Sequence, residues 1–242
     1  MKIDLIIKLK KKIGISCKKN KKENYALIVG RYRIFHSTYL LFCSLALNRE
    51  KKINQYFLNE KHLTKPEKNL FTNFGIEPKN YSQKIDVIQY GIIFIKSVSL
   101  FMKGSFIIIF SNFDNFVKNF KVANIYIGDL IFDSYLRYGH RFKDPKFDIY
   151  LIYYLFLGTY KTLLLDKFFN EKKLKYLILS GHSYANTNGI SARVALKKGI
   201  KVIISGFKEL NFFSKEKIDK GRYHLNNSYG LSKLKKLPYS RK

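Results

Sequence analysis

The stretch from Lys175 to Ile204, KYLILSGHSYANTNGISARVALKKGIKVII, constrains the fold of this chain more than any other. Its apolar run at 176–179 has the length of a strand and breaks into a polar loop at Ser180-Gly181. The segment from Ile190 to Lys198 ends with two lysines and is followed by Gly199, which are helix stop signals. β-branched residues then dominate 200–204, as in a buried strand. The pattern predicts a βαβ unit.

Several other segments extend this pattern to an α/β fold. Tyr25 to Val29 has the composition of a buried strand, and Gly30-Arg31-Tyr32 turns the chain into a predicted helix over 34–47. Further strands are predicted at 54–58 and 122–127, and further helices at 85–102 and 147–169. Phe106 to Phe110 fits either a strand or another helical turn. We therefore expect a Rossmann-like parallel sheet flanked by helices over residues 25–210, with a basic arm at 1–24 and a basic tail at 211–242.

The formal net charge of +29 comes from 46 basic and 17 acidic residues. Such an excess attracts nucleic acid, phosphates or an anionic membrane surface. Only 8 of the basic residues are Arg, whereas 38 are Lys. Bidentate recognition of phosphates and bases favours Arg, so nucleic-acid binding is the alternative and not the leading interpretation.

Cysteine content and the N-terminal sequence indicate the compartment. Cys17 and Cys43 are too few for a disulfide framework and lack a zinc-binding spacing. The apolar run at 5–7 is too short for a signal peptide. We expect a cytoplasmic protein without a metal, and peripheral contact with the anionic inner face of the cell membrane remains open.

Two long apolar stretches, 87–110 and 147–165, require a test for membrane spans. Charged residues interrupt both, with Lys96 and Lys103 in the first and Asp148 and Lys161 in the second. A spanning helix is made of about 20 mostly uncharged residues. Both stretches are therefore predicted to be buried helices of the fold.

The polar loop of the βαβ unit holds the first group of candidate residues. Ligands of α/β sheets bind beyond the carboxyl ends of the strands, where this loop lies. Free backbone N–H groups at the start of the next helix bind anions, and His, Tyr and Asn side chains can hydrogen-bond sugar or phosphate oxygens. A loop histidine that bonds the backbone and a tyrosine that packs over the loop are the alternatives. The candidates are His182, for acid/base chemistry or phosphate contact, and Ser183, Tyr184, Asn188 and Arg193 for substrate binding.

A second candidate group follows the predicted strand at 122–127. Gly128 leads into Asp129, Asp133 and Arg137, whose spacing of four residues places them on or near one face of a helix. An acidic residue at this position either begins a helix favourably or supplies a site carboxylate. We assign Asp129 as the candidate base or acceptor-positioning carboxylate, and Gly128, Asp133 and Arg137 as substrate-binding residues.

The segments IGDLIFDSYLR at 127–137 and SGHSY at 180–184, the latter with Gly189, Arg193 and Ala195, carry a family resemblance. They resemble bacterial surface-polysaccharide (capsule or O-antigen) biosynthesis proteins of the GT-B glycosyltransferase kind, in their N-terminal, acceptor-side half. The similarity covers about residues 120–205. It implies a transferase that uses a nucleotide sugar as donor substrate and a glycan or lipid-linked acceptor, with no other cofactor.

The chain departs from that family in one respect, because no second Rossmann-like domain is recognisable after residue 205. The resemblance therefore implies that the nucleotide sugar is bound by a missing or separate domain. A non-enzymatic nucleic-acid-binding protein and an inactive truncated remnant are the two rival interpretations.

Overall fold

The computed structural model describes residues 25–29, 54–59, 69, 72–73, 76–80, 86–139, 145–170, 174–180, 188–205 and 210–213. Several predicted features lie outside these residues. They are the basic arm at 1–24, the helix at 34–47, most of the polar loop after residue 180, and the part of the basic tail at 211–242 that follows residue 213.

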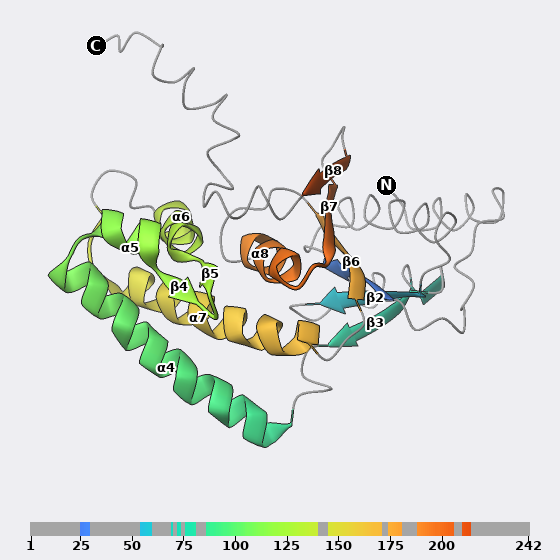
Figure 1. Ribbon diagram of the computed structural model, residues 1–242, viewed down its shortest axis with the longest axis horizontal. Helices are drawn as coiled ribbons and strands as arrows, with labels where there is room; N and C mark the ends of the chain where they lie inside the picture. The colour runs from blue at the N-terminus through green and yellow to red at the C-terminus, as the bar shows by residue number, and fades with distance from the viewer. Residues whose placement is uncertain are drawn as a thin grey trace, which may run out of the picture.

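The described strands form a six-stranded sheet in the order β3-β2-β1-β6-β7-β8 (Figure 1). The strands are β1 (Tyr25–Val29), β2 (Asn54–Asn59), β3 (Glu77–Asn80), β6 (Leu174–Ser180), β7 (Lys201–Ser205) and β8 (Leu210–Phe213). Every neighbouring pair is parallel except β7 and β8. Helix α8 (Ile190–Lys197) lies between β6 and β7 in the sequence, so the predicted strand, helix and second strand of the βαβ unit are confirmed.

Successive strands are added to the sheet on one side of β1 and later on its other side, so the strand order reverses between β1 and β6 although the two strands are parallel. From β1 the chain adds β2 and β3 on one side, and after a long helical segment it returns to β6 on the other side of β1. The register pairs Val29 of β1 with Leu179 of β6, so the carboxyl ends of these two strands are neighbours. In open α/β sheets a ligand crevice forms where the strand order reverses.

A group of helices fills the segment between β3 and β6. These helices are α4 (Val87–Phe110), α5 (Phe113–Asn119), α6 (Gly128–Tyr138) and α7 (Ile149–Asn170). Helix α7 packs against α4, α6 and α8, and its buried side chains include Leu151, Leu155 and Leu165 (Figure 1). Its first turn is capped because the Asp148 carboxylate accepts hydrogen bonds from the backbone N–H groups of Tyr150 and Leu151 at 3.0 and 3.1 Å.

The single strand predicted at 122–127 is wrong. The structure has a short antiparallel hairpin there, with β4 (Lys121–Val122) paired to β5 (Ile125–Tyr126). Ala123 and Asn124 make the turn with φ of 49° and 58°, the left-handed conformation that a two-residue hairpin turn requires. The sequence does not reveal that the chain reverses here, because each strand has only two residues and the whole segment reads as one mostly apolar run.

The apolar stretch at 87–110 is helical, as predicted, but the prediction that this helix is buried is wrong. Helix α4 continues through the predicted end at Gly104, because this glycine lies against Leu155 of α7 and Phe120. Only a narrow stripe of α4 is buried, made of Ile93, Ser97, Gly104 and Ile108. Most of its other apolar side chains face solvent, among them Ile88 at 71% and Ile95 at 69% exposure.

Gly128, at the start of α6, is the position where the fold tolerates a side chain least. A Cβ atom there would collide with the backbone carbonyl of Phe116 in α5. Because backbone atoms cannot rotate away, we expect Gly128→Ala to lower the free energy of unfolding by about 2–4 kcal/mol, measured by urea denaturation.

Gly91 supplies the matched control, since a Cβ atom there would meet nothing within 4 Å. Gly91→Ala should raise the free energy of unfolding by about 0.5–1 kcal/mol, because alanine loses less conformational freedom in a helix. Equal effects of the two substitutions would contradict the packing at Gly128.

Candidate functional site

The hairpin and the close approach at Gly128 together place Asp129. The backbone N–H of Ile127 donates to the carbonyl of Phe120 at 3.1 Å, which extends the hairpin pairing to the C-cap residue of α5. Helix α6 then begins at Gly128, and Asp129 lies in its first turn. An acidic side chain is favourable at this end of a helix.

A buried arginine from α8 meets this carboxylate. Arg193 donates from Nη1 to Oδ1 of Asp129 at 2.6 Å and from Nη2 to Oδ2 at 2.5 Å. Nη1 also donates to the backbone carbonyl of Tyr126 at 2.6 Å. The side chains are 3% exposed for Arg193 and 20% for Asp129. The pair is bidentate, which fixes the geometry of both groups and joins segments far apart in the sequence.

Helix α8 is an unusual place for a cation, because every residue from Ile190 to Leu196 is buried. A guanidinium without a partner in such surroundings would lose its hydration with no compensation. The pair with Asp129 provides that compensation. At the end of the helix, Lys198 forms an ion pair with Asp166 of α7 at 2.9 Å, and Lys197 donates to the backbone carbonyl of Ala123.

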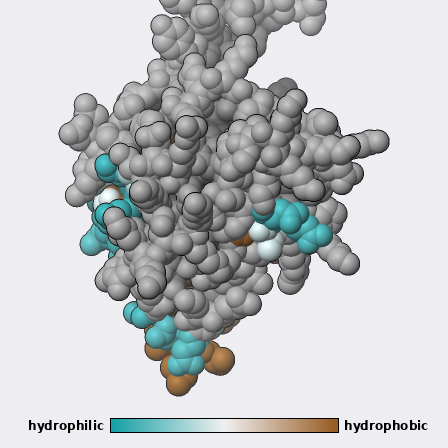
Figure 2. Space-filling view, turned by 90° about the vertical axis from the view of Figure 1, so that its right-hand side faces the viewer, coloured by the Kyte–Doolittle hydropathy of each residue, from teal (hydrophilic) through white to brown (hydrophobic). Residues whose placement is uncertain are grey.

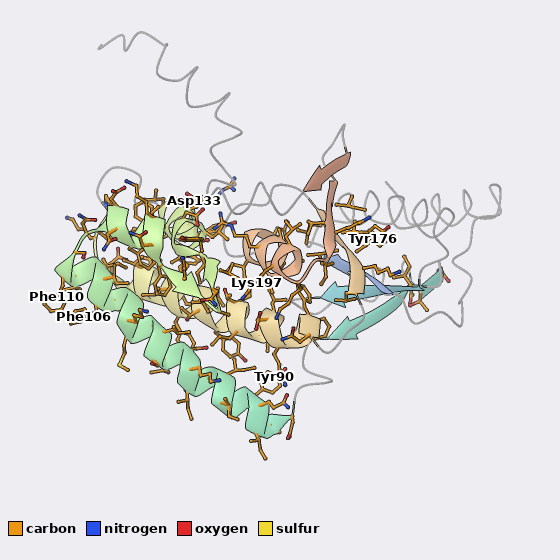
Figure 3. The ribbon with its side chains drawn as sticks, in the orientation of Figure 1. Tyr90, Phe106, Phe110, Asp133, Tyr176 and Lys197 are labelled. Atoms are coloured by element: carbon orange, nitrogen blue, oxygen red, sulfur yellow. The ribbon has the colours of Figure 1, made fainter. Side chains whose placement is uncertain are left out.

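Asp133, one helical turn after Asp129, has different surroundings. Figure 3 shows Asp133 on α6. Burial and, to a smaller extent, the charge of Asp129 raise the pKa of Asp133 from 3.8 to about 6, although Arg193 and Arg137 act in the opposite direction. The two carboxyl groups of α6 therefore differ in protonation behaviour. Asp129 is ion-paired with Arg193, whereas Asp133 can exchange a proton near neutral pH.

The other predicted site residues have three different outcomes. The backbone approach to Phe116 gives Gly128 a packing role. Arg137 lies in the last turn of α6 with an exposed side chain, and Asn188 is buried at 4% exposure just before α8. His182, Ser183 and Tyr184 lie outside the described residues.

The pairing of Asp129 with Arg193 could not be found from the sequence alone. The two residues are 64 positions apart, and no local pattern links them. One signal was present, because Arg193 is one of only 8 arginines in a lysine-rich chain and lies in an apolar helix. A lone Arg at a buried position predicts an acidic partner, although not which one.

The described residues contain no cluster of three or more His, Cys, Asp or Glu side chains that could hold a metal ion. The comparisons find no match to this chain among protein-family models, curated proteins or solved structures.

Removing the buried cation should be severely destabilising. We expect Arg193→Ala to lower the free energy of unfolding by about 3–5 kcal/mol, because it leaves Asp129 unpaired in a partly buried place. Urea denaturation measures the change. The control is Lys118→Ala, which breaks an ion pair with Asp114 whose side chains are 62% and 71% exposed. That loss should stay below about 1 kcal/mol, and an equal loss at both sites would contradict a structural role for the buried pair.

The raised pKa of Asp133 predicts how stability depends on pH. The folded chain holds a proton on Asp133 up to pH about 6, whereas the unfolded chain releases it near 3.8. The stability from this group is therefore fully present below the lower value and is lost as pH rises through the upper one. Asp133→Asn should remove this dependence and raise the free energy of unfolding at pH 7 by on the order of 2–3 kcal/mol. A wild-type minus variant difference that is constant from pH 4 to 7 would contradict the shift.

Proposed function

We propose that this chain is the acceptor-side, Rossmann-like domain of a GT-B glycosyltransferase that acts in surface-polysaccharide biosynthesis. A nucleotide sugar is the donor substrate and is held by a separate domain, and a glycan or lipid-linked acceptor is the partner substrate. The reaction takes place on the cytoplasmic side of the cell membrane.

One observation carries this proposal: a buried arginine of α8, the helix that follows β6, pairs with Asp129 of α6 and acts on the charge of Asp133 one turn further along α6. Strand β6 is also where the strand order reverses, a position that favours a ligand crevice. The motif at 127–137 and the motif at 180–193, which carry the family resemblance, thus supply one shared cluster of charged side chains.

The contacts favour a division of roles between the two carboxylates. Both oxygens of Asp129 accept hydrogen bonds from Arg193, so we assign Asp129 as a positioning residue and not as the base favoured by the sequence. Asp133, with a pKa of about 6, is ionised at neutral pH and still basic enough to accept a proton. His182 keeps its proposed role in acid/base chemistry or phosphate contact.

The chemistry that we propose is an inverting glycosyl transfer. The acceptor oxygen attacks the anomeric carbon of the sugar, and its proton passes to the carboxylate of Asp133. The bond between the anomeric carbon and the nucleoside diphosphate breaks, and the diphosphate leaves with the electron pair.

Gene deletion and complementation in the native host test this proposal. Deleting the gene should shorten or abolish a surface polysaccharide, and the wild-type gene should restore it. Asp133→Asn should fail to restore it, although the variant is expected to be at least as stable as the wild type at neutral pH. Gel electrophoresis of extracted polysaccharide, with immunoblotting for the protein, measures both quantities.

Asp114→Asn is the matched control, because this aspartate is exposed on α5 and forms an exposed ion pair with Lys118. It should restore the polysaccharide fully. An unchanged polysaccharide after deletion would overturn the proposed function, and full restoration by Asp133→Asn would overturn the role of Asp133.

A further inference from the structure

The outward face of α4 carries large apolar side chains along its length, with Ser99 the one polar residue among them. Residues spaced by three and four positions lie on one side of a helix. The exposed fractions along this side are high, and Figure 3 shows Phe106 and Phe110 pointing away from the other helices. We call this surface the α4 ridge and define it as Ile88, Ile92, Ile95, Met102, Phe106 and Ile109, with exposures of 71%, 47%, 69%, 58%, 61% and 57%.

The opposite side of α4 fixes the orientation of this ridge. Ile93, Ser97, Gly104 and Ile108 form the buried stripe, and α4 packs along α7. The rings of Phe94 on α4 and Phe156 on α7 meet edge to face with centroids 5.7 Å apart. The helix cannot turn its ridge inward without losing these contacts. Figure 2 shows hydrophobic surface at the lower end of the molecule, where α4 begins.

An apolar ridge of this size on the surface of a soluble domain usually marks a binding surface. By length and composition α4 could also cross a bilayer. Its packing against α7 opposes that arrangement, because α7 would have to enter the bilayer with it and carries Lys161, Asp166 and Lys167. A helix that lies in the plane of the interface buries the ridge and leaves α7 outside.

We propose that the α4 ridge docks on an anionic lipid bilayer, with α4 lying parallel to the membrane surface. The charges on the helix identify the partner. Lys96 and Lys103 are the charged residues of α4, both are exposed, and their seven-residue separation places them along one flank of the ridge. Lysines in this position reach the lipid headgroups while neighbouring apolar side chains enter the acyl region.

A second copy of the chain fits the same ridge less well. Pairing two α4 helices would bring together two chains that each carry a net charge of +29, and the flanking lysines have no acidic residue on α4 to meet. Like charges at such a contact repel each other, whereas anionic headgroups attract the lysines.

Membrane docking goes beyond the proposed transferase function and does not depend on it.

Vesicle co-sedimentation of the full-length chain tests the proposal. The wild type should bind vesicles of phosphatidylcholine with phosphatidylglycerol, and bind much less to phosphatidylcholine alone. The triple variant Ile95→Gln, Met102→Gln and Phe106→Gln should bind the mixed vesicles at least about tenfold more weakly, since three side chains no longer enter the lipid. These side chains are exposed, so the variant should keep its circular dichroism spectrum and melting temperature.

A second pair of variants tests the charges and remains informative if the triple variant misfolds. Lys96→Gln with Lys103→Gln should weaken binding to the mixed vesicles by about fivefold for each lysine. Lys118→Gln with Lys121→Gln removes two exposed lysines outside α4 and should have a smaller effect.

Three results would overturn the proposal. One is wild-type binding that is absent or equal on both kinds of vesicle. Another is equal loss of binding from the two lysine pairs. The third is a stable dimer in sedimentation velocity that the folded triple variant abolishes while vesicle binding is unchanged, which would assign the ridge to a second copy of the chain.

Discussion

The buried guanidinium of Arg193 is the constraint on which the described part of the fold depends. This side chain joins three segments. It belongs to α8, pairs with Asp129 of α6 and donates to the Tyr126 carbonyl at the end of the hairpin. A cation at 3% exposure is stable only if its partners are fixed. The close contact of Gly128 with α5 and the hairpin geometry provide that fixed position.

The same low-polarity surroundings explain why Asp133 differs from Asp129. Charge on one carboxylate is compensated by Arg193, whereas burial and the neighbouring negative charge disfavour charge on the other. A carboxyl group whose ionisation costs folding free energy is of little use for stability alone. This cost is the physical reason to regard Asp133 as a functional residue.

Helix α4 shows the opposite case, because it is an apolar segment that is mostly exposed. Its apolar side chains surround the helix, but only a stripe of four residues is buried. The charges that interrupt this stretch disfavour a membrane span and so predict burial, yet Lys96 and Lys103 are compatible with an interfacial helix as well as with a buried one. Hydropathy alone does not distinguish these environments, since core and lipid are both apolar.

The sequence by itself determined the elements that depend on local signals. The strand at Tyr25–Val29, the unit from β6 to β7 and the long helix α7 follow from apolar runs, periodicity and stop signals within a few residues. It also pointed to Gly128, Asp129, Asp133 and Arg193. Only the tertiary structure decided the order of the strands, the hairpin at 121–126, the exposure of α4 and the pairing of Asp129 with Arg193. The strand order, the exposure of α4 and the ion pair arise from contacts between residues far apart in the chain, which no local pattern encodes. The hairpin is local, but its strands of two residues each are too short to show a pattern.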